Sequence, residues 1–314
     1  MKQRNLGKSG LKVSLIGLGC NNFGGRIDLE ATRKVVHKAL DLGITMFDTS
    51  DSYGNRGGSE TFLGQILGPR RKEVVLATKF SSQMDDAGRM KGASRRYIMS
   101  AVEDSLRRLN TDWIDLYQQH WFDPETPLEE TLRALDDLVH QGKVRYIGCS
   151  NFAAWQVTDA QWISRQLGIY SFVSCQNEYS LLVRQPEGEL LPAMQRFDLG
   201  LLPYFPLASG LLTGKYKRNV APPQDTRMAA WPQLAERYLS EANWTIVERL
   251  EKFCAQRNRS MAELAISWLA ARPQVSSVIA GATKPEQVEQ NARAAEWELA
   301  SEEIAEIDQL TAKN

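Results

Sequence analysis

Phe47-Asp48-Thr49-Ser50-Asp51-Ser52-Tyr53-Gly54 completes a short apolar segment, residues 46–48, and leads into a longer amphipathic one. A brief apolar strand without polar alternation is typical of a parallel sheet that is buried on both faces. The acid and the phenol follow where this strand ends. In parallel barrels, functional residues lie at the carboxyl ends of the strands, so this stretch predicts both the fold and the place of its site.

The same alternation of brief apolar and longer amphipathic segments continues along the chain. Leu128, Leu132, Leu135 and Leu138 recur at helical spacing, and Gly142 is suited to a helix end. Strand and helix units recur at roughly 30 residues or more, and eight of them predict a closed parallel barrel. The predicted strands cover residues 15–18, 46–48, 74–78, 114–118, 144–148, 173–176, 201–204 and 277–279.

Three features complete the predicted architecture. Residues 4–13 surround Gly7-Lys8-Ser9-Gly10 and predict a hairpin, whereas residues 214–231, with Pro222-Pro223-Gln224-Asp225, are polar and irregular, as in a mobile lid. After Asn291 a helical spacing resumes, and the last residues are expected to be frayed. We therefore predict an α/β fold, a (β/α)8 TIM barrel with a short N-terminal β-hairpin cap and a C-terminal helical tail. It forms one domain over residues 1–314.

The charge balance and the apolar segments exclude several functional classes. With 38 basic and 38 acidic residues, the chain has no overall field that would attract nucleic acid or an anionic membrane. No signal peptide follows the N-terminus, and the most apolar window, residues 199–212, is too short to span a bilayer. Four cysteines lack C-x-x-C spacing and only three histidines occur, so no metal site is expected. We expect a cytoplasmic protein without nucleic-acid or membrane partners.

Four residues suit the reduction of a carbonyl group: Asp48, Tyr53, Lys79 and His120. Each alone has an ordinary structural explanation, but they fall at the same ends of the second, third and fourth predicted strands. A lysine beside a tyrosine lowers the phenol's pKa from about 10, and an aspartate keeps the lysine charged. The phenol could then protonate a carbonyl oxygen while hydride reaches the carbon. His120 could orient that oxygen or help to carry the proton.

Several motifs extend this pattern from the first strand to the last. They are Gly17-Leu18-Gly19, the stretch 47–54, Gly58-Ser59-Glu60, Ala77-Thr78-Lys79, residues 115–120, Gly148-Cys149-Ser150-Asn151-Phe152, residues 176–180 and residues 281–287. In this order they resemble the aldo-keto reductases, in particular the branch with bacterial reductases and potassium-channel β subunits. The resemblance implies that Asp48, Tyr53, Lys79 and His120 are catalytic and that Tyr53 is the general acid.

A nicotinamide cofactor is the expected source of the hydride, since no arrangement for covalent catalysis occurs. Gly17-Leu18-Gly19 is followed by Asn22 where a third glycine would complete a Rossmann fingerprint, so this segment predicts a tight turn instead. The resemblance assigns Ser150, Asn151 and Gln176 to the nicotinamide amide. It implies that the nicotinamide ring stacks on Tyr204.

Two later segments are the predicted phosphate sites. Phe205 replaces the small hydroxyl residue of many relatives, so the backbone amides from Leu207 to Leu212, loosened by Gly210, are expected to cradle the pyrophosphate. Thr283-Lys284-Pro285-Glu286 predicts a capping box at a helix start, where the family binds the adenosine 2′-phosphate. A helix start with an adjacent lysine suits a phosphate, so we expect NADP (NADPH) over NAD. Because one lysine holds phosphate less firmly than an arginine clamp, dual use stays open. The predicted cofactor contacts outside the nicotinamide site are Phe205, Leu207, Ser209, Gly210, Leu212, Gly281, Thr283, Lys284, Gln287, Gln290 and Asn291, the last three facing the adenine or forming a solvated helix face.

The predicted substrate pocket is apolar and aromatic, which suits small aldehydes and ketones. Its walls are Asn22, Phe23, Trp121 and Trp231, and Arg184 and Arg227 are the arginines that could reach it. One alternative is an NADP(H)-binding, redox-sensing regulatory subunit with little turnover, against which the lack of an N-terminal extension counts. Another is a barrel hydrolase or isomerase, which would need paired carboxylates or a metal cluster. The chain is a monomer or a homo-oligomer.

Overall fold

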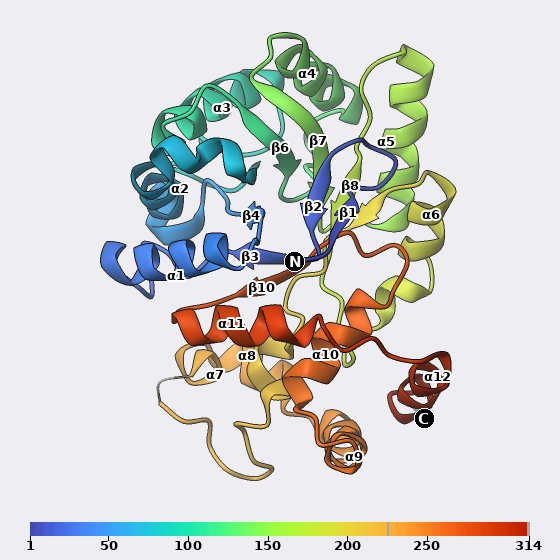
Figure 1. The fold of residues 1–314 in the computed structure, drawn as a ribbon. Coiled ribbons are helices and arrows are strands. Elements are labelled where there is room, and N and C mark those ends of the chain that lie inside the picture. Colours follow the sequence, from blue (N-terminus) through green and yellow to red (C-terminus); the bar gives the residue numbers. More distant parts are fainter. Residues whose placement is uncertain (225, 313–314) are drawn as a thin grey trace.

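A ring of parallel strands surrounded by helices forms the centre of the computed structural model, which describes residues 1–224 and 226–312 (Figure 1). Neighbouring strands follow the chain order from β3 to β9, and β10 pairs with β3. Almost every strand residue is buried, as expected for a parallel sheet covered by helices. The strands are β3 (Ile16–Gly19), β4 (Met46–Asp48), β5 (Val75–Phe80), β6 (Ile114–Gln119), β7 (Val144–Ser150), β8 (Ser174–Gln176), β9 (Gly200–Leu201) and β10 (Val278–Gly281).

Backbone hydrogen bonds close the ring between β9 and the segment that leads into β10. The Ser276 amide donates to the Leu201 carbonyl at 2.9 Å, and the Ile279 amide donates to the Pro203 carbonyl at 3.0 Å. The predicted (β/α)8 barrel is therefore confirmed, with each predicted strand present. The seventh strand is shorter than predicted, because Pro203 has no N–H to donate to the ladder.

Amphipathic helices cover the outside of the ring. In α1 the buried residues include Val35, Val36 and Ala39, and the Asp28 carboxylate caps the helix start by accepting from the Ala31 amide. All of the helices around the ring contain buried residues. They are α1 (Leu29–Asp41), α2 (Tyr53–Leu67), α3 (Arg95–Leu109), α4 (Leu128–His140), α5 (Ala154–Leu167), α6 (Leu190–Arg196), α11 (Pro285–Ala294) and α12 (Ser301–Leu310), with the 3-10 segments η1 (Gly68–Glu73) and η2 (Gln185–Glu187).

The predicted hairpin, β1 (Gln3–Asn5) and β2 (Lys12–Ser14), closes one end of the barrel. Leu6 and Val13 are fully buried and share a core cluster with barrel residues such as Met46 and Leu116. Gly7 turns the chain with φ +56°, and a Cβ there would lie 2.5 Å from the Val173 carbonyl oxygen. Since the hairpin fills the amino-terminal end, a ligand can enter only from the carboxyl ends of the strands.

A long excursion between β9 and β10 folds over the other end. It contains η3 (Ala208–Thr213), α7 (Arg227–Ala230), α8 (Pro232–Tyr238), α9 (Glu241–Gln256) and α10 (Met261–Ala270). Figure 1 shows α7 and α8 beside α10 and α11. We refer to residues 214–224 and 226–238 as the lid. The prediction of irregular structure over 214–231 is wrong at α7, whereas Asp225 and the expected frayed residues 313–314 lie outside the described residues.

The lid is attached to the barrel through Glu178, which follows β8. Arg237 of α8 donates to Glu178 Oε2 at 2.5 Å, and the Tyr238 hydroxyl donates to the other carboxylate oxygen.

The helical tail predicted after Asn291 is present as α12. Among the helices of the described residues, none has the length and apolar character needed to cross a membrane.

Candidate active site

A cavity of about 1290 Å³ lies at the carboxyl ends of the strands and below the lid. It exceeds the roughly 300–1,000 Å³ usual for small-ligand pockets, so it has room for a dinucleotide together with a small substrate. Residues from the ends of β3, β4, β7, β8 and β10 line it, and so do His120 after β6 and Arg227 of α7. The barrel therefore brings together side chains that are distant in sequence.

Asp48 and Lys79 form a buried ion pair at the floor of this cavity. Lys79 Nζ lies 2.9 and 2.8 Å from the two carboxylate oxygens of Asp48 and 2.8 Å from the carbonyl oxygen of Thr49. The lysine side chain is completely buried. Burial has the largest single effect and lowers the pKa of Lys79, but Asp48 and Tyr53 together outweigh it and raise that pKa above its usual value. The lysine is therefore charged at neutral pH.

Tyr53 begins α2 and lies next to this pair, with Lys79 Nζ 5.0 Å from the centroid of its ring. Burial raises the pKa of Tyr53, and the positive charge of Lys79 opposes that rise without cancelling it. The predicted lowering of this pKa by the lysine is thus wrong in its net direction. The phenol stays protonated at neutral pH, which is the form that a proton donor requires.

His120 lies edge-on to Tyr53, with 5.9 Å between the ring centroids. Its Nδ1 atom lies 3.2 Å from each of two hydroxyl oxygens, Ser50 Oγ and Ser82 Oγ. Burial and then the charge of Lys79 lower the pKa of His120 to about 3, so the imidazole is neutral at physiological pH. Trp121 stacks on the same ring at 5.5 Å and lines the cavity as predicted.

The residues predicted for the nicotinamide amide form a connected polar rim. Gln176 Nε2 donates to Asp48 Oδ1 at 2.8 Å, and Ser150 Oγ donates to the Gln176 carbonyl at 2.9 Å. Asn151 Nδ2 donates to the His120 carbonyl at 3.1 Å, while the Tyr204 hydroxyl donates to Asn151 Oδ1 at 2.7 Å. All four predicted side chains line the cavity, and these bonds hold them in fixed orientations.

The segment predicted to cradle the pyrophosphate is built differently from the expectation. The amides of Gly210 and Leu212 already donate to the Leu207 carbonyl, at 2.8 and 3.2 Å. Leu212 packs in the core and does not line the cavity, whereas Phe205, Leu207, Ser209 and Gly210 do. The hydroxyl of Ser209 is buried without a hydrogen-bond partner in the described part of the chain. An anion held here would therefore meet a hydroxyl group that lacks a partner.

Arg227, at the start of α7, supplies a positive charge beside this segment. Its Nη2 donates to Asn22 Oδ1 at 3.1 Å, and its guanidinium carbon lies 5.3 Å from the Phe205 ring centroid. Burial, reinforced by the charge of Arg26, lowers the pKa of Arg227 from its usual value. Within residues 1–224 and 226–312, no Asp or Glu is close enough to Arg227 to form an ion pair. A half-buried cation without a carboxylate is suited to an anionic ligand.

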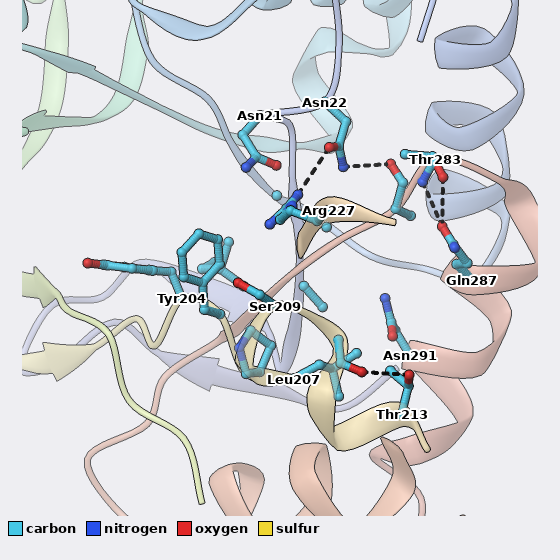
Figure 2. Close-up of a pocket in the computed structure, with 18 of the residues that line it drawn as sticks. Asn21, Asn22, Tyr204, Leu207, Ser209, Thr213, Arg227, Thr283, Gln287 and Asn291 are labelled. Atoms are coloured by element: carbon cyan, nitrogen blue, oxygen red, sulfur yellow. Dashed lines mark hydrogen bonds between the residues drawn. The ribbon is translucent and has the colours of Figure 1, made fainter. Parts of the chain in front are cut away.

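Asn22, which was predicted as a wall of the substrate pocket, lines the cavity and also binds the lid. Its amide nitrogen donates to the Ala282 carbonyl at 3.3 Å and its carbonyl oxygen accepts from Arg227, so it connects the end of β10 with α7 (Figure 2). The prediction considered Arg227 only as a residue that could reach the substrate. The place of Arg227 in the cavity wall could not be found by periodicity, because the lid has no regular pattern before α7.

The predicted helix start for the adenosine 2′-phosphate is present, with a different cap. The α11 helix begins at Pro285, and the capping box predicted for Thr283 and Glu286 is wrong. Gln287 Oε1 instead accepts from the Thr283 amide at 2.7 Å and from its hydroxyl at 3.2 Å, as Figure 2 shows. The cavity is lined here by Gly281, Thr283, Lys284, Gln287, Gln290 and Asn291.

Two predicted substrate-pocket residues lie elsewhere. Phe23 is fully buried in the core and does not line the cavity, because its loop folds back between the barrel and α2. Trp231 is 44% exposed and does not line the cavity, and Arg184 pairs with Glu187 and Asp308 outside it. Residues that the sequence reasoning missed include Cys20, Asn21, Arg26, Glu178, Thr213 and Lys215, all of which line the cavity. In the described residues, no three His, Cys, Asp or Glu side chains are grouped to hold a metal ion.

Comparison with known proteins agrees with this geometry. The sequence model described as the aldo/keto reductase family matches residues 15–312. The chain is 38% identical to a "Probable voltage-gated potassium channel subunit beta" of Oryza sativa, over 94% of this chain and 91% of that protein. It is 36% identical to the L-glyceraldehyde 3-phosphate reductase of Escherichia coli, over 98% and 92%. It is also 32% identical to the versiconal hemiacetal acetate reductase of Aspergillus parasiticus, over 98% and 96%. Because the family model covers nearly all of the chain, the chain belongs to the aldo/keto reductase family.

Proposed function

We propose that this chain, acting as one domain, is an NADP-dependent reductase of small aldehydes and ketones with Tyr53 as its general acid. One observation carries the proposal: a protonated phenol that lines the cavity lies beside a charged, fully buried lysine and beside a neutral histidine. Relatives named as reductases support the reaction class. Four free, buried cysteines support a reducing compartment, and hence the cytoplasm.

The proposed reaction adds one hydride and one proton to a carbonyl group. NADPH, when bound, supplies the hydride to the carbonyl carbon. The Tyr53 hydroxyl gives its proton to the carbonyl oxygen, which becomes the alcohol oxygen, and the Lys79 ammonium stabilises the phenolate that remains. Asp48 keeps Lys79 charged and fixed in position. His120 holds the carbonyl oxygen through its Nε2 atom, since Nδ1 faces the hydroxyls of Ser50 and Ser82.

The residues of the cavity fit the proposed cofactor. Ser150, Asn151 and Gln176 would hold the carboxamide, and Tyr204 would stack on the nicotinamide ring. Arg227 and the Ser209 hydroxyl, which line the same cavity, would bind the pyrophosphate. Lys284, at the amino-terminal end of α11, would bind the 2′-phosphate, which favours NADP over NAD and leaves dual use open.

A regulatory role is the second candidate, since the chain is 38% identical to a probable potassium-channel β subunit. Such a protein would bind NADPH in the same cavity and turn it over slowly. The two candidates agree on cofactor binding and differ in turnover. Turnover is therefore the property that separates them.

The test mixes the purified protein with NADPH and a panel of small aldehydes and follows the loss of NADPH absorbance. We expect Tyr53→Phe to lower kcat by about 10²–10⁴-fold while NADPH affinity stays within about twofold. Tyr170→Phe, at an exposed tyrosine outside the cavity, is the matched control and should reduce like the wild type. A wild type that binds NADPH but reduces no aldehyde would favour the regulatory role. Equal rates for Tyr53→Phe and the wild type would show that another group donates the proton.

A further inference from the structure

We propose that Asp51 is a positioning residue which acts through Ser50 and decides which ring nitrogen of His120 carries the proton. This inference rests on the proposed function, because the tautomer matters only if His120 contacts a carbonyl oxygen. In the reaction described above Asp51 has no part, and Ser50 only faces Nδ1 of His120. Both are buried directly behind the catalytic residues, in the stretch that follows β4.

Three side chains form a continuous hydrogen-bonded row. Ser50 Oγ lies 3.0 Å from Asp51 Oδ1 and 3.2 Å from His120 Nδ1. Asp51 is only 2% exposed, and its backbone amide donates to the Lys79 carbonyl at 3.2 Å, which fixes it against β5. The second carboxylate oxygen, Oδ2, has no hydrogen-bond partner in the described part of the chain. Ser50 is therefore the side chain that links this carboxyl group to His120, and its Oγ also lies 3.0 Å from Ser52 Oγ and accepts from the Ser52 amide at 3.3 Å.

The groups around Asp51 do not balance a negative charge there. Glu60 of α2 faces it, and Arg108 of α3 is already bound to Glu60, with Nε 2.6 Å from Oε2. The phenols of Tyr97 of α3 and Tyr117 of β6 also face this carboxyl group. Burial first, and then the charge of Glu60, raise the pKa of Asp51 to about 7. Asp51 can therefore hold or release a proton near neutral pH while His120 remains neutral.

The protonation state of Asp51 determines the tautomer of His120, because the hydroxyl of Ser50 has only one proton to donate. When Asp51 is ionised, Ser50 donates its only proton to the carboxylate and can only accept from Nδ1–H of His120. The Nε2 atom then has no proton to donate. When Asp51 is protonated, it can donate to Ser50, which can then donate to Nδ1, so that the proton of His120 is on Nε2. That tautomer can donate a hydrogen bond to the carbonyl oxygen of the substrate.

Ser82 limits the size of this coupling. Its hydroxyl is also 3.2 Å from His120 Nδ1, and it can donate there in either state of Asp51. The structure connects Ser50, but not Ser82, to the carboxyl group of Asp51. The two serines are thus a matched pair, in which removal of one should abolish the coupling and removal of the other should strengthen it.

The experiment reads the tautomer of His120 directly. The chain has three histidines, so a protein labelled with ¹⁵N-histidine gives a simple spectrum, and the His120 signals are those missing in His120→Gln. Long-range ¹⁵N–¹H spectra between about pH 5.5 and 8.5 give the proton population on each ring nitrogen. In the wild type we expect the population to move from Nε2 to Nδ1 with a midpoint near pH 7. Asp51→Asn and Ser50→Ala should abolish this change, and Ser82→Ala should enlarge it.

An identical pH dependence in wild type and Asp51→Asn, or a tautomer in the wild type that does not change with pH, would overturn the inference. The signals of His37 and His140, which lie outside the site, show whether Asp51→Asn is still folded. If Asp51→Asn does not fold, Ser50→Ala against Ser82→Ala decides the question. The spectra need no turnover, so a protein that reduces no carbonyl refutes the proposed function and leaves this measurement valid. A protein that reduces carbonyls with a fixed tautomer refutes this inference alone.

Discussion

Lys79 Nζ lies 2.8 Å from Asp48 Oδ2, and both side chains are almost completely removed from solvent. An ion pair in this position costs a large desolvation energy, which its own attraction and additional hydrogen bonds must offset. Here Gln176 and Gln118 also donate to Asp48, at 2.8 and 3.3 Å. The carboxylate is therefore the point where β4, β5, β6 and β8 are joined at the floor of the cavity.

Removing the charge of Asp48 should destabilise the fold strongly. In Asp48→Asn, Lys79 stays buried without a carboxylate, and we expect the free energy of unfolding to fall by about 3–5 kcal/mol. The measurement is urea unfolding at neutral pH. Glu73→Gln is the matched control, because Glu73 forms an ion pair with Arg70 at 2.9 Å but its side chain is 53% exposed. That change should cost less than about 1 kcal/mol. If both variants lost the same free energy of unfolding, burial of the Asp48–Lys79 ion pair would not explain the effect of Asp48→Asn.

Arg227→Ala should weaken cofactor binding without affecting the floor of the cavity. A hydrogen bond between a charged donor and a phosphate contributes about 1.5–3 kcal/mol, so the Kd for NADPH should rise about 10- to 150-fold. Titration of protein fluorescence with NADPH measures it. Arg218→Ala is the control, since Arg218 lies in the same lid but pairs with Glu241 and Glu248 and does not line the cavity. An unchanged Kd in Arg227→Ala would remove Arg227 from the phosphate site.

Lys284→Ala should change the choice between the two nicotinamide cofactors. Only NADPH has the 2′-phosphate, so its Kd should rise about tenfold or more, while the Kd for NADH should stay within about twofold. Lys252→Ala, on the exposed side of α9, should change neither value. The two affinities are measured by the same titration for each variant. A parallel loss for both cofactors would mean that Lys284 supports the helix end rather than the phosphate.

The sequence predicted those parts of the site that depend on barrel geometry. Asp48, Lys79 and His120 could be brought together from sequence because each ends or follows a short apolar strand, and parallel strands end on the same side. Arg227 and Phe23 could not be placed in this way. Their positions depend on how a long excursion and a short loop fold back, and such contacts leave no periodic pattern.

The side-chain hydrogen bonds were also beyond sequence reasoning. Thr283 was predicted as the N-cap from its spacing to Glu286, but the N-cap is Lys284, one residue later. The side chain that accepts from a backbone amide at the helix start is accordingly Gln287 and not Glu286. Helix boundaries inferred from sequence commonly differ by such a shift. The raised pKa of Tyr53 has a similar origin, because burial of the ring decides its direction and the sequence contains no measure of burial.

The raised pKa of Asp51 predicts a distinct dependence of stability on pH. Its pKa is about 7 in the folded protein, whereas the ordinary value for an aspartate is 3.8, so between these values the folded state binds a proton that the unfolded state does not. The resulting stabilisation is fully present below about pH 4 and is lost as the pH rises through about 7. The lowered pKa of His120 acts in the opposite sense, so the prediction concerns the difference between variants. Relative to the wild type, Asp51→Asn should gain stability from about pH 4 to about pH 7, by at most on the order of 4 kcal/mol, and then stay level. Urea unfolding across this range measures the difference, and Asp86→Asn, at a side chain that is 91% exposed, should show almost none. A difference for Asp51→Asn that is flat with pH would show that this carboxyl group is ionised throughout.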